Sequence, residues 1–189
     1  MLGRGSDVEF HNGLTDEDCD RVCIIGNKLF SVGTLRVNYT TYDVCREQDT
    51  VNPRTHPFVM VKSGETAKNA HQFWYAQVLG VFHASVLDTD VESTVRSPQR
   101  VEFLWVRWLG IDPDHHSGFR HTRLPKMGFI PDDDPDAFGF LDPSHVIRGC
   151  HLIPAFAHGR TTSLMPYQGE TLARTPGEDE DWVYFYVNM

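Results

Sequence analysis

The residues whose types could support catalysis follow the apolar run 101–109, where the chain changes to Gly, Pro, Asp and His. Three histidines there lie close in sequence to two carboxylates: His115, His116, His121, Asp112 and Asp114. Imidazole with carboxylate is a ligand set for a divalent metal. The spacing matches no zinc signature and HExxH is absent, so solvated loop histidines are the better interpretation. A metal-dependent hydrolase at these histidines is our third hypothesis, and we expect neither a metal nor a cofactor.

Other catalytic patterns are also missing from the sequence. Cys150 is followed by His151, but neighbours on a strand point to opposite faces and cannot form a nucleophile and base pair. There is no GxSxG motif and no glycine-rich phosphate loop. The acidic stretch 130–139 lacks the carboxylate spacing of a calcium loop. We therefore expect a protein that is not an enzyme.

Binding is the second chemistry that the sequence could support. The formal net charge is -9, yet residues 96–126 hold six Lys and Arg against three Asp and Glu. A locally basic segment could contact phosphates, although a solvated surface gives the same pattern. The basic residues that would make such contacts are Arg107, Arg120, Arg123 and Lys126.

Aromatic residues could form a surface for a protein partner. We expect this surface to combine the loop 110–139 with Trp108 and with Tyr184 and Tyr186, which share a strand face by the two-residue period. Trp105 is expected in the interior. The alternative is that Trp108 is buried in a second small core beneath the loop.

Composition limits the class of protein. A chain of 189 residues with 40% hydrophobic residues suits one domain with a real core. The longest apolar runs are far shorter than the ~20 residues of a membrane span, and we expect no secretory signal. The four cysteines form no dense framework, so reduced thiols are expected.

Most of the elements that the sequence predicts are strands. Residues 28–44 favour strands around a turn at Gly33, and 73–86 and 101–109 are apolar on both faces, which is typical of central strands. Asp142 and Pro143 predict a short helix that ends by Gly149. Further short strands are expected at 58–61, 150–156 and 182–189, with long irregular loops at 110–139 and 158–181.

These patterns predict a mainly β fold: an antiparallel, partly open barrel of six or seven short strands with long loops and one or two short helical turns. Residues 1–30 are interpreted as an N-terminal leader without clear periodicity. Residues 31–189 are interpreted as a single β domain.

Four segments in order resemble bromo-adjacent homology (BAH) domains over about residues 70–189: "FWYAQVLGVFHA", "VEFLWVRWLGIDPD", "DPSHVIRGCHLIPAF" and "EDEDWVYFYVNM". The resemblance implies a nuclear module that binds chromatin or other proteins, in some members through an aromatic cage for methylated lysine. Trp108 matches the tryptophan of the family. Leu109 and Gly110 stand where aromatic residues would complete a cage wall, and Ile111 stands where Arg is usual.

A second resemblance covers most of residues 36–189 and is to a region of fungal transposon-derived proteins of the Plavaka type. It is carried by "NYTTYDVCREQDTVNPRTH", "FLWVRWLG" and "FGFLDPSHVIRGCHLIPAFAHGRT". It implies a detached or C-terminally truncated accessory region without the catalytic core of a transposase. Our leading hypothesis is therefore a non-catalytic chromatin- or protein-interaction module, and the alternative is a region that contacts nucleic acid through the basic segment 107–126.

Overall fold

The protein is mainly β and antiparallel, as predicted. The computed structural model describes residues 21–65, 71–89, 97–118, 121–165, 167, 172–174 and 177–188. These residues form thirteen strands: β1 (Val22–Val32), β2 (Leu35–Thr40), β3 (Arg46–Val51), β4 (Phe58–Lys62), β5 (Phe73–Asp88), β6 (Gln99–Ile111), β7 (Lys126–Phe129), β8 (Phe138–Leu141), β9 (Val146–Gly149), β10 (His151–Pro154), β11 (Arg160–Thr161), β12 (Asp181–Trp182) and β13 (Phe185–Asn188). Two 3-10 turns cover Pro143–His145 and Phe156–His158. No helix in the described part of the chain is long and apolar enough to cross a membrane.

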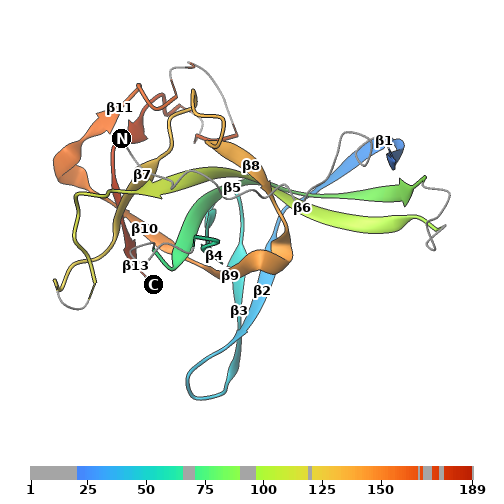
Figure 1. Ribbon diagram of the computed structural model, residues 1–189, viewed down its shortest axis with the longest axis horizontal. Coiled ribbons are helices and arrows are strands. Elements are labelled where there is room, and N and C mark those ends of the chain that lie inside the picture. The colour runs from blue at the N-terminus through green and yellow to red at the C-terminus, as the bar shows by residue number, and fades with distance from the viewer. Residues whose placement is uncertain are drawn as a thin grey trace.

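Nine strands form one sheet in the order β10-β13-β7-β6-β5-β4-β9, to which β1 adds on β5 and β8 adds on β6 (Figure 1). The two end strands, β9 and β10, follow each other in sequence and are joined by Cys150. The Cys150 N–H donates to the Phe58 carbonyl at 3.0 Å, so it still pairs with β4. One bent segment therefore provides both ends of the sheet, although the ladders of the described strands do not form a closed ring.

Strand β5 is central because both of its faces are apolar. Trp74, Ala76 and Val78 pack on one side, and Tyr75 and Leu79 pack on the other. A bulge between Val78 and Gly80 then shifts the register against β6. Val81 consequently joins the face of Trp74, although strict alternation from Tyr75 would place it on the face of Tyr75.

Gly80 lies beside this bulge, and a Cβ atom there would collide with the outer edge of the Phe82 ring. A side chain at position 80 would therefore require the Phe82 ring to move.

The core has two main layers on the two faces of the central strands. The first contains the apolar residues of β4, β5, β6 and the β2–β3 hairpin, among them Val51, Val59, Trp74, Val78, Leu104, Val106 and Trp108. The second lies between β5, β7 and β13 and contains Met60, Tyr75, Leu109, Met127, Phe129, Phe185 and Val187. A small third cluster of Leu79, Met165 and Ala173 lies under the loop before β12.

The two tryptophans of β6 differ in burial, and the less buried one is Trp105, which was expected in the interior. Trp108 is only 5% exposed and packs edge-on against Trp74, with ring centroids 6.2 Å apart. Trp105 is half-buried, and its ring lies 4.8 Å from that of Phe140. The alternative of a buried Trp108 is therefore correct as to burial, but Trp108 lies in the larger core layer and not in a second small core beneath the loop.

The segment 110–139 is less irregular than predicted. It contains all of β7 and the start of β8, and Met127, Phe129 and Ala137 are buried. Antiparallel pairing with β6 and β13 overrides the local abundance of Gly, Pro and Asp.

The helix start at Asp142 is confirmed, since its side chain accepts from the Ser144 N–H at 2.7 Å. The helix is a single 3-10 turn that ends at His145, and β9 follows. Gly149 is therefore the end of a strand and not of a helix.

Two projections leave the body of the molecule (Figure 1). One is the β2–β3 hairpin. The other, here called the arm, is a three-stranded extension made of β1, residues 82–88 of β5 and residues 99–103 of β6. Val22 to Phe30, part of the segment interpreted as a leader, thus belong to a strand, whereas residues 1–20 lie outside the described residues.

Replacing Trp108 by Ala should lower the free energy of unfolding by about 3–5 kcal/mol, because a buried indole is removed from a packed layer. Replacing the half-buried Trp105 should cost less, roughly 1–2 kcal/mol, because part of its ring is already in water. Urea unfolding monitored by circular dichroism measures both. Equal losses, or a larger loss at Trp105, would contradict the assignment of the core face.

Candidate functional site: an aromatic groove and its anchored wall

Arg107, predicted to contact phosphate, is fully buried in β6. Its guanidinium donates two hydrogen bonds to the Asp181 carboxylate, at 3.1 and 3.0 Å, and lies 4.0 Å from the centre of the Phe129 ring. An arginine that is 0% exposed cannot reach a phosphate in solution. The prediction of Arg107 as a binding residue was therefore wrong.

Asp181 also binds a second arginine. Arg174 donates to its carboxylate at 2.9 Å, and to the carbonyl oxygens of Met165 at 2.7 Å and Tyr167 at 3.1 Å. Burial would raise the pKa of Asp181, but hydrogen bonds and charge from the two arginines outweigh it, so the pKa lies below its usual value. This buried cluster of Arg107, Arg174 and Asp181 attaches the segment before β12 to β6.

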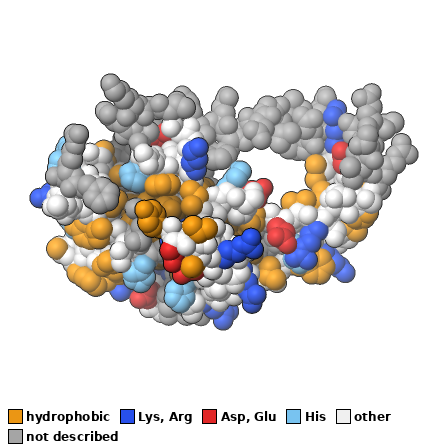
Figure 2. Space-filling view, turned by 90° about the horizontal axis from the view of Figure 1, so that it is seen from below, with side chains coloured by type: hydrophobic (Ala, Val, Ile, Leu, Met, Phe, Trp, Pro, Cys, Tyr) orange, Lys and Arg blue, Asp and Glu red, His pale blue; other side chains and the backbone are white. Residues whose placement is uncertain are grey.

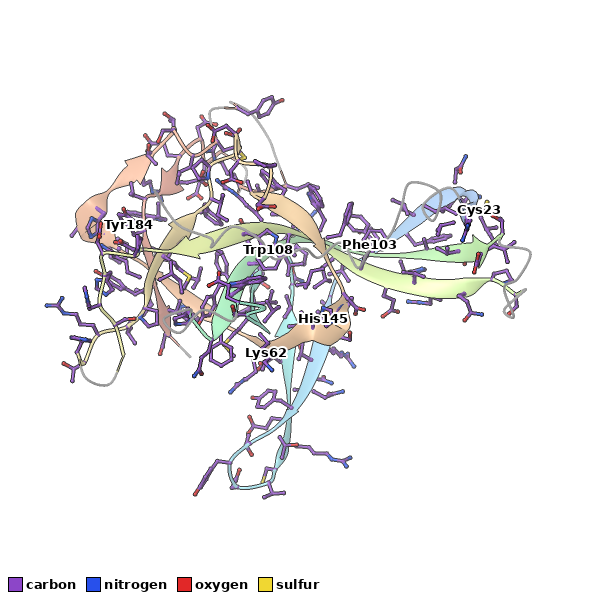
Figure 3. The ribbon with its side chains drawn as sticks, in the orientation of Figure 1. Cys23, Lys62, Phe103, Trp108, His145 and Tyr184 are labelled. Carbon is purple, nitrogen blue, oxygen red and sulfur yellow. The ribbon has the colours of Figure 1, made fainter. Side chains whose placement is uncertain are left out.

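Lys126, Tyr184 and Tyr186, three of the predicted binding residues, lie close together. The Lys126 ammonium is 2.7 Å from the Asp112 carboxylate and 4.5 Å from the centre of the Tyr184 ring. Tyr186 lies opposite Lys126 in the pairing of β7 with β13. Figure 3 places Tyr184 at the end of the molecule far from the arm.

The hydrogen bond that the Lys126 ammonium donates to the Asp112 carboxylate raises the pKa of Lys126. For Asp112, burial acts upward, but Lys126 and the Asp114 N–H shift the net pKa downward. The pair is therefore charged at neutral pH. The ring of Tyr184 is thus already occupied by a cation of the same chain.

The remaining predicted basic residues do not extend this cluster into a patch. Arg123 is exposed in the loop before β7, where its carbonyl accepts from the Gly118 N–H at 2.9 Å. Arg120 lies outside the described residues. Of the four basic residues in the prediction, Arg107 is buried and Lys126 is paired with Asp112.

Trp108 instead lies at the floor of a groove that the sequence did not reveal. The groove has a volume of about 590 Å³ and runs between the start of β5 and the loop after β6. Its lining combines indoles, imidazoles and carboxylates with apolar residues: Glu65, His71, Phe73, Trp74, Trp108, Leu109, Gly110, Ile111, Asp112, Pro113, His115, His116, Ser117 and His121. A buried tryptophan at its floor and exposed histidines at its rim give it an apolar base and a polar edge.

The start of β5 is fixed by local hydrogen bonds. The Trp74 indole N–H donates to the Glu65 carboxylate at 3.3 Å, and the His71 ring nitrogen Nδ1 lies 2.9 Å from the Phe73 carbonyl oxygen. These contacts hold one wall of the groove in a defined position.

The opposite wall consists of the described residues 112–118 and 121, and it is anchored at its base. The Asp112 N–H donates to the Lys126 carbonyl at 2.9 Å. His115 contacts the Leu124 carbonyl at 3.1 Å through Nε2, and its ring lies 5.9 Å from that of Tyr186. The Lys126, Tyr184 and Tyr186 cluster is thus the support of this wall.

A second pocket of about 710 Å³ lies between β3, β4 and the β9–β10 segment. Asp49 accepts from the Gly149 N–H at 3.0 Å and from the Arg148 side chain at 3.3 Å, and Arg148 stacks on Tyr39. The charged groups at its edge therefore bind one another, which makes this pocket a less suitable ligand site than the groove.

The groove contains no recognisable catalytic arrangement. Within the described ranges, no group of three or more His, Cys, Asp or Glu residues is placed to hold a metal ion. Burial raises the pKa of the Cys150 thiol to about 12, which suppresses the nucleophilic thiolate.

Comparisons of the chain with protein-family models, curated proteins and solved structures found no match.

Replacing Asp181 by Asn should lower the free energy of unfolding by about 3–5 kcal/mol at neutral pH, because two buried guanidinium groups lose their counter-charge. The pKa of Asp181 is lower in the folded protein than in the unfolded chain. Its contribution is therefore complete above the unfolded pKa of about 3.9 and is lost as the pH falls through the lower folded value. The difference between wild type and variant should thus shrink below about pH 4.

Chemical unfolding across this pH range measures the effect. The matched control is Glu178→Gln, which removes an exposed carboxylate 3.4 Å from Arg160 and should change stability by about 1 kcal/mol or less. A loss at Asp181 no larger than that of the control would contradict the proposed strength of the cluster.

Proposed function

We propose that this chain is a non-catalytic protein-interaction module that receives an extended basic segment of a protein partner in the groove. The observation that carries the proposal is the lining of the groove: an apolar tryptophan floor, the Glu65 carboxylate on one wall and polar groups of an anchored loop on the other. Pockets with this division into an apolar floor and a few placed polar groups are typical ligand sites.

The charge of the chain favours a basic partner. The net charge is -9, which attracts cationic segments and repels polyanions at long range. Within the groove, Asp112 is neutralised by Lys126, so Glu65 is the carboxylate that a Lys or Arg side chain of the partner would approach. Basic segments are common in chromatin proteins, which agrees with the nuclear, chromatin-associated role that the resemblance to BAH domains implies.

We also propose that the sheet is a partly open, BAH-like barrel. The support is the segment 146–154, which pairs with β4 through its first half and with β13 through its second half.

A fungal, transposon-related origin is proposed on the sequence resemblance alone. The proposal does not extend to a methyl-lysine cage, since Leu109 is a core residue and Tyr184 already contacts Lys126.

The alternative, contact with nucleic acid through residues 107–126, has less support. Arg107 is buried and Lys126 is held by Asp112, so among the described residues of that set Arg123 is the exposed one. Because affinity for DNA grows with each phosphate neutralised, we expect weak binding that decreases as salt rises.

A deca-lysine peptide should bind the chain and change its tryptophan fluorescence, since Trp74 and Trp108 line the groove. Glu65→Gln should weaken this binding about fivefold, as expected for the loss of one partly exposed ion pair of about 1 kcal/mol. The matched control is Glu102→Gln on the arm, which removes the same charge far from the groove. Equal weakening by both variants would mean that only net charge matters and would contradict the groove as the site.

A pull-down from nuclear extract, with and without nuclease, separates the two functions. We expect the captured proteins to survive nuclease treatment. Partners lost with nuclease, together with tight, salt-sensitive binding of duplex DNA that disappears on replacing Arg123, would favour the nucleic-acid alternative.

A further inference from the structure

Histidines are concentrated at the groove. Four of the ten histidines in the chain line it: His71, His115, His116 and His121. The first lies just before β5, and the other three follow β6. Histidine is the side chain whose charge ordinarily changes between about pH 5 and pH 8. The charge of the groove can therefore change in this range while the fold stays the same.

The other charges at the groove stay constant over the same range. The pKa of Asp112 is lowered and that of Lys126 is raised, so both members of this ion pair remain charged. Glutamate is ordinarily ionised above about pH 5, so Glu65 supplies a negative charge throughout. Protonation of all four imidazoles would thus change the charge of the lining, counted together with Lys126, from one negative to three positive.

Two of the histidines form an exposed pair at the rim. The rings of His116 and His121 lie with their centroids 5.7 Å apart, and both side chains are exposed. The His121 N–H donates to the Gly118 carbonyl at 3.0 Å, which links the second histidine back to the turn. As cations, two rings this close would repel any further cation beside them. Solvent protons reach this pair without any opening of the fold.

The other two histidines are half-buried and face backbone carbonyls. His115 Nε2 lies 3.1 Å from the Leu124 carbonyl oxygen. His71 Nδ1 lies 2.9 Å from the Phe73 carbonyl oxygen, which is the shorter of its two contacts with Phe73. The nitrogen that faces a carbonyl carries a hydrogen, and the second nitrogen of the ring can still take up a proton. Both contacts therefore persist when charge is added to these walls.

The titratable and charged groups around these histidines come from the neighbouring segments: Glu65 before β5, Tyr75 of β5, Asp112 and Asp114 after β6, Arg123 and Lys126 before and in β7, and Tyr186 of β13. Burial raises the pKa of Tyr75, which keeps it neutral. Lys126 neutralises Asp112, and Asp114 and Arg123 carry opposite charges outside the lining. Among the described residues, Glu65 is therefore the negative charge of the lining that no cation of the chain neutralises.

We propose that protonation of the groove histidines releases the basic partner segment, so that the chain binds its partner at neutral pH and dissociates from it in mildly acidic solution. This inference rests on the proposed function, because it concerns the same groove and the same class of ligand. His116 and His121 carry most of the effect, since they are the exposed pair. By linkage, binding of a basic segment at about pH 6 releases protons from the histidines.

The size of the effect follows from Coulomb's law. In water, a unit charge about 7 Å away changes the affinity for a cation about threefold. The two rim histidines therefore account for roughly a tenfold change, and the two half-buried histidines add to it.

Histidines outside the groove also take up protons. Figure 2 shows histidine side chains beside hydrophobic and acidic ones on the face of the body seen from below. The formal net charge of -9 counts all ten histidines as neutral, so acid also weakens the long-range attraction of the whole chain for a basic ligand. A test must separate this overall effect from the local one.

Titration calorimetry with deca-lysine, whose own charge stays constant in this range, tests the proposal at low ionic strength. The dissociation constant of the wild type should be at least tenfold higher at about pH 5.5 than at about pH 7.5. A double variant, His116→Asn with His121→Asn, should reduce this ratio at least fivefold. The matched control, His145→Asn with His151→Asn, removes two exposed histidines outside the groove and should change the ratio less than twofold.

The heat of binding gives a second measurement. At about pH 6 it should vary with the ionisation enthalpy of the buffer in the direction of proton release, and the double variant in the groove should release fewer protons. Equal ratios for the two double variants would mean that overall charge controls binding, and would overturn the proposal.

The same titrations distinguish this inference from the proposed function. Wild-type binding that is equally tight at both pH values would overturn the inference and leave the proposed function standing, whereas no binding at either pH would overturn both. Near-UV circular dichroism should be the same at both pH values. A lost signal at the lower pH would attribute the release to unfolding and would also overturn the inference.

Discussion

The path of the chain around the central sheet depends on one buried carboxylate. Asp181 holds Arg107 of β6 and Arg174 of the preceding loop at the same time. A buried ion pair is weak as a source of net stability, because desolvation offsets most of the attraction. Its effect here is to exclude other arrangements: any path that moves Asp181 away leaves two guanidinium groups without a counter-charge inside the protein. The small third core cluster and the start of β12 occupy their places under this constraint.

The groove depends on a second, partly exposed ion pair in a similar way. Lys126 belongs to the sheet and Asp112 belongs to the loop, so their contact attaches the loop to the sheet. Tyr184 and Tyr186 support the same lysine from the neighbouring strand. Of the aromatic residues that sequence reasoning assigned to partner binding, Tyr184 and Tyr186 therefore shape the site from behind, whereas Trp108 lines the groove together with Trp74 and the histidines.

The central strands could be predicted because alternation is a local property, and β5 and β6 are apolar on both faces. The same property conceals which face meets the larger core, so the sequence could not show that Trp108 is more deeply buried than Trp105. Strand β7 was missed because its four residues lie among Gly, Pro and Asp, and its partners are distant in sequence. Arg107 is the one polar residue on its face of the run 101–109, but its partner lies 74 positions later and no spacing rule connects them. Tyr184 lies outside β13, which begins at Phe185, so the expected two-residue period does not relate it to Tyr186.

The order of strands in the sheet has a consequence for synthesis on the ribosome. Strand β13 lies between β7 and β10, yet it is made after both. While the chain emerges, the edges of β7 and β10 that β13 later covers stay open, together with the apolar residues that Phe185 and Val187 pack against. This half of the sheet can assemble only after residue 188 has left the exit tunnel. Chaperones should therefore have to protect the nascent chain for longer than they protect a protein whose strands pair in the order of their translation.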